Sequence, residues 1–152
     1  MINWGDPACP VSKYFTVKDM TWLPSWSCFH NPTNDERVNL MNLALKMDTV
    51  RELLGKPVNV HVTIRPISVN CPGSSHHGGN YNKAIGSTAL KSAHISGLAM
   101  DFDAGENCDK TRATLEPHLE RLGMRLERNP GSSWLHLDLA PVPPGGHRYF
   151  SI

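Results

Sequence analysis

Hydrophobic residues recur along the chain at two spacings, one typical of helices and one typical of strands. Between residues 34 and 54 the apolar positions follow helical spacing and form one stripe. The stripe consists of Leu40, Leu43, Met47, Val50 and Leu54. Asp35 and Glu36 suit the positive end of a helix dipole, and Gly55 is a typical helix terminator. Residues 34–54 are therefore the clearest predicted helix.

Three other segments alternate between apolar and polar residues, which is the period of a half-buried strand. They are residues 58–65, 97–103 and 134–139. Residues 124–128 are a further short strand candidate, and residues 81–86 suggest one helical turn. Residues 109–123 predict a second helix, in which Pro117 must lie in the first turn or introduce a kink.

These elements predict an α+β fold, with a small antiparallel sheet packed against a few helices. The length of 152 residues is most simply one domain covering residues 1–152. Residues 1–33 are rich in Pro, Trp and Cys and have little periodicity, so we expect them to form a cap on that domain.

Composition narrows the classes of partner. The net charge is +1 and 19% of residues are charged, which gives no broad electrostatic reason to expect nucleic acid or an acidic membrane. No apolar run approaches the ~20 residues that span a bilayer. We expect a monomer with no nucleic-acid partner and no stable membrane association. The N-terminal residues lack a secretory signal pattern, which favours synthesis and folding in a cytoplasm.

The four cysteines, Cys9, Cys28, Cys71 and Cys108, show no CxxC spacing, which argues against a cysteine zinc site. An even number of cysteines permits two disulfides. A cytoplasmic origin favours reduced thiols instead.

The alternating strands favour a different metal site. In residues 97–103 and 134–139 the apolar side chains face the core, so Asp101 and His136 face the opposite side. If the two strands are neighbours, these side chains meet across the sheet. Gly97 allows the chain to bend His94 over the same face. Two imidazoles and one carboxylate are the protein ligands of a catalytic zinc ion, although such residues are also common as simple surface groups.

The stretch "SAHISGLAMDF" carries a family resemblance. It is similar to the Ser-x-His-x-x-Gly-x-Ala-x-Asp motif of zinc D-Ala-D-Ala carboxypeptidases and L-alanyl-D-glutamate endopeptidases. These peptidoglycan peptidases share a metal site with the hedgehog signalling domain. The stretches "KYFTVKDMT", "VTIRP", "YNKAIGS" and "SSWLHLDL" resemble other parts of the family in the same order, from about residue 13 to the end.

The resemblance implies one zinc ion bound by His94, Asp101 and His136. It implies that Arg65 stabilises the carbonyl oxygen as it becomes an oxyanion, whereas a solvated strand-end arginine is the ordinary alternative. Ser92 is either a hydrogen-bond partner of the substrate or a cap of its own turn.

One position departs from the family pattern. Many members carry Glu or Asp three residues before the last histidine, and this chain has Ser133 there. We consider Asp138 first, Glu127 second and Asp103 third as the general base. The alternatives are that Asp138 and Asp103 orient a metal ligand, and that Glu127 is an exposed strand acid.

Two aromatic residues and a histidine pair complete the candidates. Tyr81 and Trp134 are expected to line a substrate groove, although packing on the sheet explains Trp134 equally well. His76 and His77 lie in a Gly/Ser-rich loop over residues 68–80, which is a poor setting for a closed metal site. We expect this loop to rim the cleft.

The function that the resemblance implies is a zinc metallopeptidase acting on peptidoglycan, in the stem peptide or in a cross-link. The short chain and its phage-type start favour an endolysin, which is made in the host cytoplasm and reaches the cell wall after release. L-Ala-D-Glu, D-Ala-D-Ala and cross-link bonds all remain open. The alternatives are a non-catalytic zinc domain that binds cell wall or a protein partner, and a metal-free structural domain.

Overall fold

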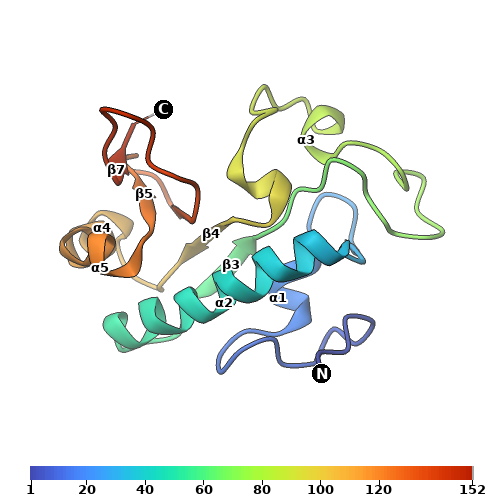
Figure 1. Cartoon of the computed structure of the whole chain (residues 1–152), viewed down its shortest axis with the longest axis horizontal. Coiled ribbons are helices and arrows are strands. Elements are labelled where there is room, and N and C mark those ends of the chain that lie inside the picture. The colour runs from blue at the N-terminus through green and yellow to red at the C-terminus, as the bar shows by residue number, and fades with distance from the viewer. Residues whose placement is uncertain (152) are drawn as a thin grey trace.

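A five-stranded sheet organises the chain in the order β3-β4-β6-β5-β7 (Figure 1). The structure is a computed structural model that describes residues 1–151. The strands are β3 Asn59–Val62, β4 Ala99–Asp103, β5 Arg125–Glu127, β6 Leu135–Asp138 and β7 Tyr149–Phe150. All neighbouring pairs are antiparallel except β5 and β7, which are parallel. The predicted α+β class is confirmed, and the expectation of a wholly antiparallel sheet is wrong at this edge.

The other elements are short apart from one helix. The helices are α1 Val17–Thr21, α2 Asn34–Leu54, α3 Tyr81–Ala84, α4 Cys108–Leu115 and α5 Leu119–Leu122. The 3-10 turns are η1 Ala93–Ser96 and η2 Glu116–His118. A separate two-stranded sheet joins β1 Trp22–Leu23 to β2 Cys28–Phe29.

Helix α2 has the predicted limits because both of its ends are capped. The Thr33 hydroxyl accepts a hydrogen bond from the Glu36 amide at 3.3 Å, and the Glu36 carboxylate accepts one from the Thr33 amide at 2.8 Å. Gly55 ends the helix in the left-handed conformation with φ of 67°. Helix α2 crosses one face of the sheet (Figure 1), and its buried stripe belongs to the core together with Met100, Phe102, Leu135 and Leu137.

The predicted helix over residues 109–123 is divided into α4, η2 and α5. Pro117 lies in η2, because it lacks the amide that a continuous α-helix needs at that position. The three predicted inward leucines, Leu115, Leu119 and Leu122, are buried.

Strand β3 departs from strict alternation. The pairing of β3 with β4 shifts between Val60 and Val62, so that His61 is an extra residue in the ladder. After this irregularity Val62, Thr63 and Ile64 are all buried, although the alternation places Thr63 on the polar side. The segment that leads to Arg65 is therefore buried on both sides.

The cap over residues 1–33 is fastened to the loop over residues 68–80. Cys28 and Cys71 form a disulfide, while Cys9 and Cys108 are free. The buried His30 ring accepts a hydrogen bond from the Asn70 amide at 2.9 Å beside this disulfide. The expectation of reduced thiols is therefore wrong for this pair, because the fold brings together two cysteines that are 43 positions apart. Among the described residues, no helix combines the length and apolarity required to cross a bilayer.

Candidate metal centre

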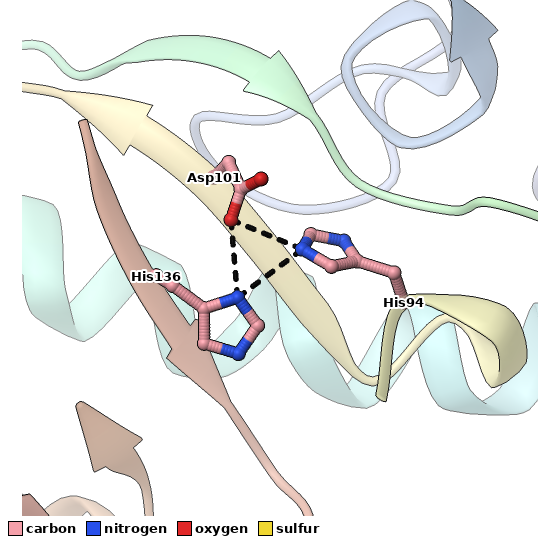
Figure 2. Close-up of side chains that lie close together, drawn as sticks. All are labelled: His94, Asp101 and His136. Atoms are coloured by element: carbon pink, nitrogen blue, oxygen red, sulfur yellow. Dashed lines mark hydrogen bonds and ion pairs between the residues drawn. The ribbon is translucent and has the colours of Figure 1, made fainter. Parts of the chain in front are cut away.

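Three side chains from separate elements meet on the face of the sheet opposite the core (Figure 2). Asp101 Oδ1 lies 3.0 Å from His94 Nε2 and 3.1 Å from His136 Nδ1. The two imidazole nitrogens are 3.2 Å apart. The predicted meeting of His94, Asp101 and His136 is confirmed.

Strand pairing and one glycine produce this arrangement. In the ladder between β4 and β6, Asp101 lies directly opposite His136. Gly97 follows η1 with φ of 75°, a left-handed conformation that turns the chain from His94 into β4. A Cβ atom on Gly97 would lie 3.0 Å from Leu40 of helix α2. The turn therefore needs a glycine for its backbone angle and for its close approach to the helix.

The spacing of the three donor atoms fits a tetrahedral metal ion. Bonds of about 2.0–2.1 Å in tetrahedral geometry place neighbouring ligand atoms about 3.3 Å apart. The distances of 3.0–3.2 Å are close to that value. The group is well shielded from solvent, with exposed fractions of 2% for His94 and 7% for Asp101. The donor set and its geometry can therefore hold one divalent ion.

A backbone carbonyl orients His94. The Nδ1 atom lies 2.6 Å from the carbonyl oxygen of Thr63. A carbonyl oxygen only accepts hydrogen bonds, so Nδ1 carries a proton, and Nε2 is the ring nitrogen that faces Asp101 and His136. The Thr63 hydroxyl in turn donates to the carbonyl of Asp19 at 2.7 Å, which fixes Thr63 against the N-terminal cap.

A carboxylate orients His136. The Nε2 atom lies 2.9 Å from Oδ2 of Asp138. Arg125 donates two hydrogen bonds to the same carboxylate, at 2.7 and 2.8 Å. Asp138 is completely buried, so its charge is balanced within this row of side chains. The arrangement holds Nδ1 of His136 toward Asp101 and His94.

Charges within the group shift its pKa values strongly. Burial alone would raise the pKa of Asp101, but hydrogen bonds with His136 and His94 outweigh it and hold the pKa well below its usual range. Burial alone would lower the pKa of His136, but hydrogen bonds with Asp101 and Asp138 raise it to about 9. Without a metal ion, His136 is therefore a cation between two carboxylates at neutral pH.

Arg65 lies next to the three donor atoms. Its Nη2 atom donates to Oδ2 of Asp101 at 3.3 Å, and its backbone amide donates to the carbonyl of His94 at 2.9 Å. The Arg65 Nε atom is buried and has no hydrogen-bond partner among residues 1–151. Arg65 therefore steadies the second oxygen of Asp101 through Nη2, while its Nε–H is buried without a partner among the described residues.

The three acids considered as general base have different surroundings. Asp138 contacts Nε2 of His136, which is the ring nitrogen that does not face Asp101 and His94. Asp103 accepts hydrogen bonds from Asn59 and from the Gly105 amide and contacts His61 at 2.6 Å. Glu127 is half-buried and makes no ion pair among the described residues. Continuing the register between β5 and β6 by one residue sets Glu127 opposite His136.

A cleft of about 470 Å³ opens beside His136. One wall is formed by residues 88–93 before η1, and the other by Arg125, Asp138 and Phe150 of the neighbouring strands. Ser92 lines this cleft, and its hydroxyl also accepts a hydrogen bond from the His94 amide at 3.3 Å. Both interpretations of Ser92 are therefore compatible with its position.

The two aromatic candidates and the histidine pair lie outside this cleft. Tyr81 is buried, with its hydroxyl 2.9 Å from Ser25, so the expectation that it lines a groove does not fit its place in the core. Trp134 is 40% exposed at the start of β6. His76 is exposed and stacks on Trp26 with ring centroids 4.2 Å apart. Among the described residues, the metal-binding geometry involves neither His76 nor His77.

Sequence reasoning missed Arg125 and Thr63. Alternation in the short strand over residues 125–127 puts Arg125 and Glu127 on one face, which is a usable signal once the pairing with β6 is known. Thr63 acts through its backbone carbonyl, so its residue type carries no signal.

Comparison of the chain with family models, with curated proteins and with solved structures found no match. The family resemblance accordingly rests on the sequence motifs themselves.

Proposed function

We propose that this protein is a zinc metallopeptidase that hydrolyses a peptide bond in bacterial peptidoglycan, as a phage endolysin with a hedgehog-type zinc fold. The observation that carries the proposal is the triangle of donor atoms from His94, Asp101 and His136. It consists of the residues that the peptidase motif implies, and it lies beside a cleft that can admit a peptide.

A bound zinc ion supplies a Lewis acid that lowers the pKa of water to about 7 and polarises a carbonyl group. The chain supplies the remaining groups. Arg65, whose side chain lies beside Asp101 and is 24% exposed, is the donor for a developing oxyanion. Residues 88–93 and Phe150 confine the peptide between the two walls of the cleft.

In this proposal Glu127 is the general base that accepts a proton from water, because the serine at position 133 cannot act as that base. Two points support the assignment. Extending the register of β5 and β6 by one residue sets Glu127 opposite His136, and Glu127 forms no ion pair among residues 1–151. Asp138 is a positioning residue, because Arg125 occupies both of its oxygens and His136 shares one of them. Both oxygens of Asp103 are likewise occupied, one by the Asn59 amide and the other by the His61 ring.

The direct test is to incubate the zinc-loaded protein with isolated peptidoglycan and to identify new amino termini by mass spectrometry. His136→Ala should abolish release, and Glu127→Gln should lower the rate at least about 100-fold while zinc remains bound. His61→Ala is the matched control, because His61 lies near the same face and outside the donor group. Equal release by His136→Ala and the parent protein would refute the proposal.

A second function is favoured by one observation, the serine at position 133. A zinc domain without an acid at that position can bind cell wall or a protein partner without cleaving it. Stoichiometric zinc together with no cleavage of any peptidoglycan preparation would select this function. Protein purified without chelator that contains no zinc would favour a metal-free structural domain.

A further inference from the structure

A second cavity of about 450 Å³ adjoins the metal cleft and shares two of its walls, Arg125 and Phe150. It is lined by residues of the paired strands β5 and β7 and of the segment that precedes β7. These strands lie near the C-terminal end of the described chain (Figure 1). Arg128, His147 and Tyr149 complete the part of its lining that can recognise a ligand. The two cavities therefore adjoin at Arg125 and Phe150, and we call the second one the cationic groove.

Two arginines stack on the aromatic residues of the cationic groove. The Arg125 guanidinium lies 4.3 Å from the Phe150 ring centroid, and the Arg128 guanidinium lies 4.6 Å from that of Tyr149. Stacking fixes the plane of a guanidinium and leaves its edge available for hydrogen bonds. The edge of Arg125 is already used by Asp138, so Arg128 is the donor that remains for a ligand.

Acids lie near the cationic groove but do not line it. Its lining contains no Asp or Glu. An adjoining cavity of about 650 Å³ shares Arg128, His147 and Tyr149 with it and is also lined by Glu116 and Glu120. Arg128 forms no ion pair with residues 1–151, whereas its neighbour Arg148 is paired with Glu120 at 2.9 Å. The closest acid on β5 is Glu127, which faces the metal group and does not line the groove. An arginine that stacks on an aromatic ring and forms no ion pair among the described residues suits a planar anion.

We propose that the cationic groove is a substrate subsite that binds a free carboxylate of the peptide, with Arg128 as its principal contact. This proposal rests on the proposed peptidase function and narrows its substrate class to peptides that carry a carboxylate beyond the scissile bond. Tyr149 and Phe150 pack against the aliphatic part of the same peptide residue.

The test uses two peptides, acetyl-L-Ala-γ-D-Glu-L-Lys-D-Ala with free carboxylates and the same peptide with carboxamides. Binding to the protein, with and without zinc, is measured by NMR titration that follows the side-chain N–H signal of Arg128. We expect the acid peptide to bind about tenfold more tightly than the amide, since one exposed charge-assisted contact is lost in the amide. Arg128→Gln should remove this preference and Arg128→Lys should retain part of it. Arg121→Gln, an exposed arginine outside both cavities, should leave it unchanged.

The outcomes separate this proposal from the peptidase function. Equal affinity of the parent for the acid and amide peptides overturns the subsite, and so does a preference that survives Arg128→Gln. Displacement of the acid peptide by inorganic phosphate at an equal concentration assigns the groove to anions in general and overturns its role as a carboxylate subsite. A preference lost in Arg128→Gln, together with no cleavage of either peptide or of peptidoglycan, supports the subsite and contradicts the peptidase function.

Discussion

On the core face of strands β4 and β6, Met100, Phe102 and Leu137 are fully buried in one cluster with helix α2. On the opposite face of the same two strands, Asp101 and His136 meet His94 in a charged group. Contacts on the core face are non-directional, so many combinations of apolar side chains can satisfy them. Contacts on the polar face have fixed donors and acceptors, so each atom has a defined partner. The core face therefore supplies stability, and the polar face supplies the defined geometry of the candidate metal group.

The largest expected effect comes from the core face. Phe102→Ala should lower the free energy of unfolding by about 3–5 kcal/mol, because it removes a fully buried ring from a packed core. Urea denaturation of the metal-free protein measures this loss. The zinc affinity of the fraction that stays folded should change by less than about threefold, since the donor atoms lie on the other face. A large fall in affinity would show that the two faces are not separable.

On the polar face, Asp101→Asn should reduce zinc affinity by more than about 100-fold, which exceeds the usual effect of changing a residue that only orients a ligand. The variant keeps the shape of the side chain and removes its charge. Competition with a chromogenic chelator measures the affinity. Asp103→Asn is the control on the same strand and face, and it should bind zinc nearly as well as the parent because Asp103 pairs with His61 and Asn59.

A smaller effect is expected one step away from the donor atoms. Asp138→Asn should weaken zinc binding about 10- to 100-fold, since an amide no longer holds the ring of His136 by its charge. Chelator competition gives the affinity, and nitrogen NMR of the imidazole reports which ring nitrogen is protonated. An unchanged affinity with an unchanged tautomer would mean that the strand alone orients His136.

The last test leaves the sequence unchanged and varies pH, with an expected effect of about tenfold for each unit. The pKa of His136 is raised to about 9 in the metal-free protein, so zinc must displace a proton at pH 7. Affinity should fall about tenfold for each pH unit between about 9 and 7, and calorimetry in buffers of different ionisation enthalpy should find about one proton released. The raised pKa also stabilises the metal-free fold below about pH 6.5, and this stabilisation is lost as pH rises through about 9. A metal-free protein whose melting temperature rises over that interval would contradict the assignment.

The sequence predicted those parts of the molecule that depend on local periodicity. Helix α2 has its predicted limits because its stripe, its capping box and Gly55 all lie within the segment itself. The division of the second helix was foreseeable from Pro117, since a missing amide acts locally. The meeting of Asp101 and His136 was foreseeable because alternation fixes which side of a strand each residue faces, and the turn at Gly97 accounts for His94.

Other features depended on which segments become neighbours. Asp138 was the first choice for the base, and its bond to Arg125 follows from the pairing of β5 with β6. The disulfide between Cys28 and Cys71 requires the cap to lie on a loop far along the chain. The burial of Tyr81 depends on Ser25 and Trp26 of the same cap.

By itself the sequence determined helix α2, the faces of β4 and β6 and the donor types of the candidate metal group, because each of these follows from spacing within one segment. Only the tertiary structure decided how that group is held and charged. Two groups that hold it, the Thr63 carbonyl and the Arg125 guanidinium, come from segments that sequence order does not bring together. Asp138, in contrast, follows His136 by two residues in the same strand. Hydrogen bonds and charge pairs act over a few ångströms in space, so their identity is fixed when the strands pair.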